Sequence, residues 1–251
     1  MKLKSILIII LTLTIIILPE IALSLSNPLS KIRFPNEEET TMQVYRSNGK
    51  IGTRRSKVFD RGSSYLIRTI EEDGSTSKMF IDKKTLKPLV FYDTDPEGKT
   101  IRYAKFYKNN KMYLAFPEDG IEKTVNIPEN AYDMQSLYYV FRAFPFEKDE
   151  INVNLVMHDP GNIRNVGMTV KKVAVEEIEV ASGKFVCYKL EMGCSNIIER
   201  VFWPHKYYFW YTVAKPHHFV KFAGKEADLT VVTNELLSYK VGKRYVVKVP
   251  R

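Results

Sequence analysis

The sequence predicts a mainly β protein built on a single, strongly curved antiparallel sheet, with one main amphipathic helix in its concave face. Short alternating runs separated by turn dipeptides fill most of the chain. One segment carries a helical apolar stripe, and a lone helix among about ten strands has to lie on the sheet. No internal repeat, low-complexity tract or linker divides the sequence, so we expect one domain over residues 38–240.

The first 24 residues are predicted to be a signal peptide. Two lysines precede an apolar run of about 14 residues, and Ala22-Leu23-Ser24 forms a small-residue cleavage motif. The alternative is an uncleaved anchor, but Pro19 and Glu20 end the run before the roughly 20 residues of a spanning helix. We therefore expect a periplasmic or secreted protein with no stable membrane span after cleavage, and a flexible lead over residues 25–37.

The net charge of +9 falls almost wholly on the mature chain, which keeps about +8. Export makes nucleic acid an unsuitable partner. Anionic lipid headgroups or envelope polymers are the counter-charges that such a surface would meet, and the alternative is that the lysines only maintain solubility.

Two cysteines in an exported chain raise the question of a disulfide. Cys187 lies in a predicted strand and Cys194 at a turn containing Gly193, with another strand expected beyond it. Seven residues of extended chain separate the two Cα atoms by about 20 Å, whereas a disulfide needs less than about 7 Å. We expect two free thiols.

The first half of the domain reads as successive hairpins. Asn48-Gly49 and Asp73-Gly74 are the two strongest hairpin signals, because both positions of such a turn tolerate positive φ. The runs that these and later turns separate span residues 41–47, 51–60, 63–72, 76–82, 89–95, 99–107 and 111–116.

The main helix is predicted over residues 132–144. Asn130 is a suitable N-cap, with Asp133 three residues later, and Pro145 ends the run. The stripe that would face the sheet consists of Met134, Leu137, Tyr138, Phe141 and Phe144.

Further strands are expected over residues 150–158, 166–192, 201–222 and 227–240, followed by a basic tail over 241–251 that is an edge strand or frayed. The third of these runs is unusually aromatic. Phe209 and its neighbours two residues away share one face, and Trp210 belongs to the other. One face would pack under the helix and the other would line a concavity, unless the strand is a core strand that binds nothing.

Catalytic motifs are not evident. Adjacent His217 and His218 would point to opposite faces of a strand, so we expect no metal site and no cofactor. Glu177 and Glu179 share a face, which suits a solvated strand better than a carboxylate pair. The helix carries three polar residues, Asp133, Ser136 and Arg142. A helix cap and exposure to solvent explain most of them, and Arg142 could pair with a buried carboxylate or interact with the C-terminal end of the helix dipole.

Four short motifs resemble those of an exported bacterial family, domain of unknown function 3108. They are DKKTLKPL at 82–89, DMQSLYYVFR at 133–142, VASGKFVCYKL at 180–190 and PHHFVKF at 216–222. The resemblance covers about residues 38–240. The family is similar to the periplasmic lipoprotein-carrier superfamily, which implies an open half-barrel that is plugged by helices and can shelter acyl chains. It supplies no catalytic residues, and this chain has a single clear helix where carriers have more.

We therefore expect a non-enzymatic envelope protein that binds an apolar or amphipathic, lipid-like ligand, or an envelope partner protein, in the concave sheet. The alternatives are an enzyme that acts on an envelope polymer, with carboxylates and Arg142 as its parts, and a purely structural protein. A pocket rimmed by lysines and arginines could meet an anionic headgroup. The candidate ligand-binding residues are Tyr138, Phe141, Arg142, Phe209 and Trp210.

Overall fold

A computed structural model describes residues 28–29, 31–160, 162–202, 204–225 and 230–248. The predicted signal peptide lies outside the described residues. The strands are β1 (Glu38–Arg46), β2 (Ile51–Asp60), β3 (Ser64–Glu71), β4 (Thr76–Asp82), β5 (Pro88–Thr94), β6 (Thr100–Tyr107), β7 (Lys111–Phe116), β8 (Ile121–Asn126), β9 (Ala131–Asp133), β10 (Glu150–Asp159), β11 (Asn162–Val180), β12 (Gly183–Cys194), β13 (Tyr207–Thr212), β14 (Phe219–Lys225), β15 (Val231–Val241) and β16 (Arg244–Lys248). The helices are α1 (Met134–Val140) and α2 (Ile197–Phe202), with short 3-10 turns η1 (Pro117–Asp119) and η2 (Phe141–Ala143).

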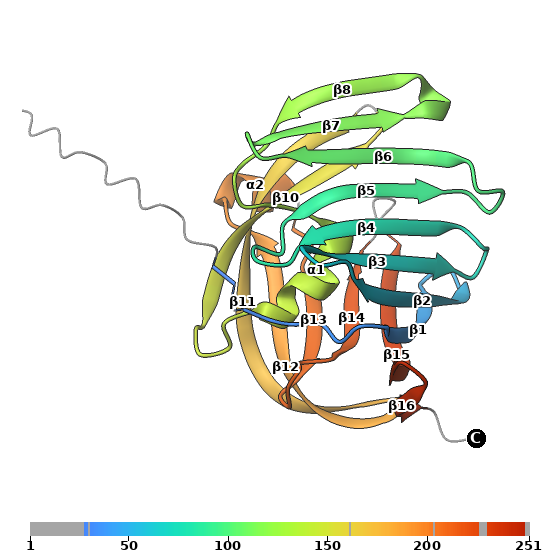
Figure 1. Cartoon of the computed structure of the whole chain (residues 1–251). Coiled ribbons are helices and arrows are strands. Elements are labelled where there is room, and N and C mark those ends of the chain that lie inside the picture. Colours follow the sequence, from blue (N-terminus) through green and yellow to red (C-terminus); the bar gives the residue numbers. More distant parts are fainter. Residues whose placement is uncertain (1–27, 30, 161, 203, 226–229, 249–251) are drawn as a thin grey trace, which may run out of the picture.

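All strands belong to one curved sheet that does not close (Figure 1). From β8 the order runs down to β1, crosses to β15 and continues down to β9, while β16 pairs with β15. The predicted fold class is confirmed, with one exception: the three residues of β9 pair in parallel with β10. The sheet also has more strands than the predicted ten, because short and half-exposed strands such as β8 carry little apolar alternation.

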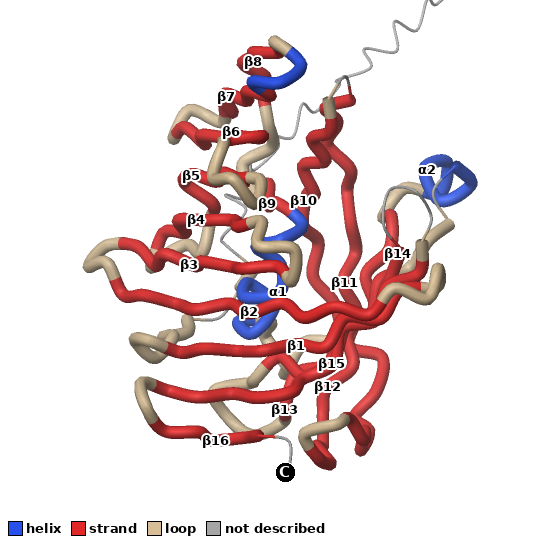
Figure 2. Tube along the Cα trace, turned by 90° about the vertical axis from the view of Figure 1, so that its right-hand side faces the viewer, coloured by secondary structure: helices blue, strands red, loops and turns tan. Residues whose placement is uncertain are grey.

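Helix α1 lies between the two walls of the curved sheet (Figure 2). One wall is formed by the hairpins β1 to β8, and the predicted glycine turns have the expected backbone, with φ of +82° at Gly49 and +89° at Gly74. The other wall contains the long β11 and β12, whose hairpin reaches back to β15, where Ser182 Oγ donates to the Leu236 carbonyl at 2.6 Å. Within the described part of the chain, no helix is long and apolar enough to cross a membrane.

The two faces of β13 belong to two separate apolar clusters. Phe209 packs in the main cluster with Leu137 and Phe141 of the helix. Trp210 lies in a second cluster with Cys187 and Leu236. Alternation along one strand therefore divides the aromatic run between two cores, as expected for a sheet that is covered on both faces there.

The helix begins later than predicted, at Met134 rather than Tyr132. Residues 131–133 extend the sheet instead, because Tyr132 is fully buried in its pairing with β10. The N-cap is Asp133, whose carboxylate accepts from the Gln135 amide at 2.8 Å, and Asn130 instead bonds to Asn154.

The structure also differs from the prediction for the segment after Cys194. Strand β12 continues through Gly193 to Cys194, and the expected strand beyond it is helix α2. Three apolar side chains of α2 face solvent: Ile197, Ile198 and Val201. Cys187 and Cys194 are both buried free thiols, as predicted.

Segments before residue 38 and after residue 240 contact the rest of the fold. In the expected lead, Ile32 and Phe34 pack against the main cluster, and the Phe34 amide donates to Tyr65 Oη at 3.2 Å. In the basic tail, residues 244–248 form the edge strand β16, which was one of the two alternatives.

A buried ion pair fixes the end of the helical segment. Arg142 of η2 forms a salt bridge with Glu38 of β1, and the two side chains are only 2% and 1% exposed. Burial disfavours the cation, but the charge and hydrogen bond of Glu38 raise the pKa of Arg142 above its ordinary value. Tyr239 Oη also donates to Glu38 at 3.0 Å, so both carboxylate oxygens have a partner.

Replacing Arg142 by Leu should lower the free energy of unfolding by about 3–5 kcal/mol, because Glu38 would stay buried without its cation. Urea denaturation measures the change. Lys99→Leu is the control, since the pair of Lys99 with Glu118 is exposed to solvent and should contribute little to stability. The double variant Glu38→Leu with Arg142→Leu should lose less free energy of unfolding than Arg142→Leu alone. An equal loss in Arg142→Leu and in the Lys99→Leu control would contradict this interpretation.

Candidate functional site

A row of polar residues crosses the concave face beneath α1. Four residues with hydroxyl side chains stand directly opposite one another on successive strands, and the Oγ atoms of Ser56 and Thr69 lie 3.0 Å apart. The same register then continues to Asp93 on β5 and Arg102 on β6. The four hydroxyl residues are Thr40, Ser56, Thr69 and Ser77. The concave face is therefore partly polar.

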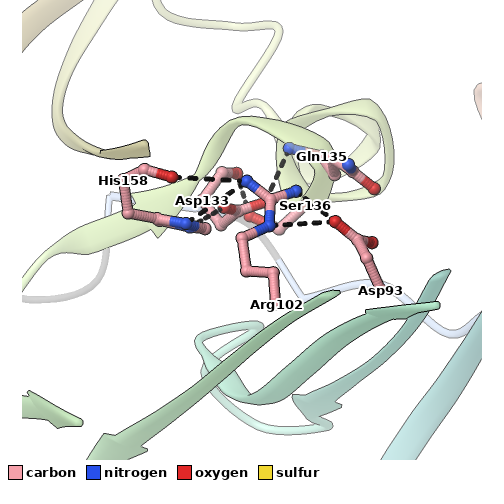
Figure 3. A network of polar contacts seen from close by, with 6 residues as sticks. All are labelled: Asp93, Arg102, Asp133, Gln135, Ser136 and His158. Atoms are coloured by element: carbon pink, nitrogen blue, oxygen red, sulfur yellow. Dashed lines mark hydrogen bonds and ion pairs between the residues drawn. The ribbon is translucent and has the colours of Figure 1, made fainter. Parts of the chain in front are cut away.

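The row ends in a network that joins the two walls through the cap of α1 (Figure 3). Arg102 donates to Asp93 Oδ2 from Nε at 2.9 Å and from Nη2 at 2.5 Å. Its Nη1 lies 3.4 Å from His158 Nδ1, and His158 Nε2 lies 2.5 Å from Asp133 Oδ2. The N-cap carboxylate, a β10 imidazole and a β6 guanidinium thus form one chain of contacts.

The neighbouring side chains determine which groups of this network donate hydrogen bonds and which accept them. Burial alone would raise the pKa of Asp133, but the hydrogen bond with His158 and the charge of Arg102 lower it, so the cap is a carboxylate. His158 Nε2 then donates to Asp133, and Nδ1 faces the Arg102 donor. Because both ring nitrogens are engaged, the imidazole is not placed to activate a nucleophile. The geometry therefore favours a role in holding the N-terminus of α1 in place over a role in proton transfer.

Two adjacent hollows flank α1. The outer hollow, of about 330 Å³, opens where β13 begins and β14 ends, and its wall includes Tyr207, Phe222 and Leu155 together with Arg102, Asp133 and His158. The inner hollow, of about 40 Å³, lies above the four hydroxyl residues. The walls that the two hollows share are Arg54, Gln135, Tyr138 and Asn234.

Two polar atoms at the inner hollow lack a partner. Among the described residues, Asn234 Oδ1 and His218 Nδ1 are the buried side-chain atoms that make no hydrogen bond. Asn234 is only 2% exposed. Buried polar atoms are normally paired, so such atoms at a hollow point to a ligand or to water.

The structure brings four of the five candidate residues together. Tyr138 separates the two hollows and packs on Phe209, and Phe141 meets Phe209 edge-on at 5.2 Å, behind the hollow walls. Arg142 lines the inner hollow. Trp210 lies apart, on the opposite face of β13, where its Nε1 donates to Glu176 at 2.7 Å.

Other expected features have structural roles. Glu177 and Glu179 are exposed, as predicted for a solvated strand face. His217 and His218 lie in a turn and not in a strand, and His217 Nδ1 donates to the Thr212 carbonyl at 2.9 Å. Tyr211 of the aromatic run donates to the Tyr138 carbonyl at 3.1 Å, which satisfies a helix carbonyl group.

Sequence reasoning missed the hydroxyl row, Asn234 and the partners of Arg102. Each member of the row sits in a different strand, and only cross-strand register aligns them. The available signal was a polar residue on the inward face of four successive strands, which becomes recognisable once the strands are aligned.

Comparisons with known proteins agree with this architecture. Residues 32–249 match the family described as "Protein of unknown function (DUF3108)". No curated protein matches this chain. A solved structure from Brucella abortus, titled as a beta-barrel-like protein of domain of unknown function DUF1849, has 10% identity and a TM-score of 0.56, and the match covers 84% of this chain and 100% of that chain. The hypothetical lipoprotein YmcC from Escherichia coli has 11% identity and a TM-score of 0.34, with 80% and 83% covered. At these identities the likeness concerns the fold alone.

Stability should fall as pH falls from about 6.5 to about 4, in part through His218. Burial and the nearby Arg142 charge lower the pKa of His218 to about 4, so the unfolded chain binds more protons in that window. We expect wild type to lose about 1–2 kcal/mol more than His218→Asn between pH 7.5 and pH 4, after allowing for solvent screening. Urea denaturation across this range measures it. The contribution of His217 cancels in the comparison, and parallel curves would contradict the assignment.

Proposed function

This chain belongs to the DUF3108 family, and we propose that it is an exported binding protein that holds an amphipathic small molecule in the two hollows beside α1. The observation that carries the proposal is the pairing of a larger hollow with a small inner one, in which hydroxyl groups and Asn234 lie among apolar side chains such as Met42 and Met79. An outer hollow of about 330 Å³ falls within the roughly 300–1,000 Å³ of small-molecule sites.

The apolar part of the ligand would occupy the outer hollow. Leu155, Met157 and Phe222 contribute apolar surface there, and their removal from water by a ligand is favourable in proportion to the area covered. The polar part would reach past Tyr138 into the inner hollow, where hydroxyl groups and Asn234 are available. The aromatic contacts of Tyr138 with Phe209 and Phe222 hold this dividing side chain in place.

The five sequence candidates take different roles in this proposal. Tyr138 and Arg142 would contact the ligand, because both line a hollow. Phe141 and Phe209 would support the wall from behind, since both side chains are fully buried. Trp210 would act only on stability, because it lies in the second cluster.

Location in the cell envelope is part of the proposal. It is supported by the sequence of the first 24 residues, in which charged, apolar and small-residue segments follow one another as in a signal peptide. An envelope location also suits a ligand of the lipid-like class, which is abundant there.

An envelope partner protein is the second candidate, favoured by the apolar face of α2. Ile197, Ile198 and Val201 are 73%, 65% and 75% exposed, although large apolar side chains are usually buried. Replacing Ile198 and Val201 by Asp should abolish in-cell crosslinks to such a partner and leave small-molecule binding unchanged. Unchanged crosslinks in that variant would exclude α2 as the contact.

An enzymatic role is less well supported, because both nitrogens of His158 are engaged.

Filling the outer hollow should abolish ligand binding. Met157 is half-buried and lines this hollow, so Met157→Trp should weaken binding of the uncharged fluorescent probe N-phenyl-1-naphthylamine at least about tenfold. Val186→Trp is the matched control, because Val186 is exposed on β12 and should not affect the probe. Fluorescence titration gives both affinities, and equal affinities in the two variants would show that the probe binds elsewhere.

A further inference from the structure

We infer that the polar end of the ligand is uncharged and donates hydrogen bonds, as a glycerol-type hydroxyl headgroup does, and is not a carboxylate or phosphate. The inference rests on the proposed function and names the ligand class of the same site. It departs from the sequence-based expectation of an anionic headgroup.

The arginines at the hollows are already neutralised. Arg54 Nε donates to Glu71 at 2.7 Å, and Arg142 pairs with the buried Glu38. The third arginine, Arg102, is bonded twice to Asp93. Each guanidinium therefore has its own carboxylate, and an anionic ligand would have to displace that carboxylate or share its cation.

The two polar atoms of the inner hollow that lack a partner would be satisfied by a hydrogen-bond donor on the ligand. Asn234 Oδ1 is an acceptor, and it is buried without a partner at the wall that the two hollows share. His218 Nδ1 is the second such atom, and its ring is neutral near pH 7 because burial and the charge of Arg142 lower its pKa. A carboxylate or phosphate oxygen accepts hydrogen bonds, so it cannot satisfy the amide oxygen, whereas a hydroxyl group can.

The floor of the hollow suits the same chemistry. The hydroxyls of Thr40, Ser56, Thr69 and Ser77 each donate and accept, as ligand hydroxyls do. A volume of about 40 Å³ offers about three water-sized places, which matches a small headgroup with a few oxygen atoms. The pairing of the three arginines, an unpartnered acceptor and the hydroxyl residues of the floor thus favour one class of ligand.

Three competitors with the same acyl chain test the inference on the full mature chain. Lauroylglycerol, laurate and lauroylglycerol phosphate would each displace bound N-phenyl-1-naphthylamine. We expect lauroylglycerol to act at a concentration at least about tenfold lower than either anion. Displacement by laurate or the phosphate at equal or lower concentration, or by none of the three, would overturn the inference and leave the proposed function standing. Failure of the naphthylamine probe to bind wild type would instead overturn the proposed function.

Variants at Asn234 test whether this side chain causes the preference for lauroylglycerol over laurate. Asn234→Leu removes the acceptor and should reduce the preference for lauroylglycerol over laurate about tenfold, with both competitors measured against naphthylamine bound to the same variant. Asn234→Asp keeps an acceptor and adds negative charge, so it should retain or increase the preference. Circular dichroism checks that both variants fold, and His218→Phe provides the same test if Asn234→Leu does not. An unchanged preference in the folded variant would overturn the role of this acceptor.

Discussion

The structure depends on buried charge that anchors one short helix at both ends inside an open sheet. At the N-terminus the Asp133 cap is held by His158 and, through it, by Arg102. Just past the C-terminus of α1, Arg142 is held by Glu38. A helix of seven residues has little stability of its own, so these contacts and its packing determine its position. The contacts at the N-terminus also connect β6 to β10, which lie far apart in the strand order of the sheet.

The space around the helix is packed where it faces the middle of β13 and hollow elsewhere, since the outer hollow opens where β13 begins and β14 ends. Leu137 and Phe141 pack against β13 and leave no space between them and the sheet. Toward β1 to β4, the helix faces short hydroxyl side chains, which do not fill the space as aromatic rings do. The polar floor that accommodates the ion pair therefore also provides the room for the proposed ligand.

Binding accounts for the polar groups better than catalysis does. A catalytic site needs converging groups that are free to act on a substrate, whereas Arg102, Arg142 and His158 are each paired with a carboxylate. The groups that do lack partners are an amide oxygen and a neutral ring nitrogen, which recognise a ligand without transforming it. One fold can host unrelated functions, and it is the groups at the site that favour binding.

The sequence by itself determined the sheet, its hairpin turns, the approximate helix and the unbridged thiols, because alternation, glycine turns and chain length act locally. It also indicated that Arg142 could serve a buried carboxylate, but not that Glu38 would be the partner. Tertiary structure alone decided the helix start, since β10 captures residues 131–133 as a strand. It likewise placed the Trp210 face of β13 in a second apolar cluster. It also aligned the hydroxyl row, because cross-strand register joins residues far apart in the chain.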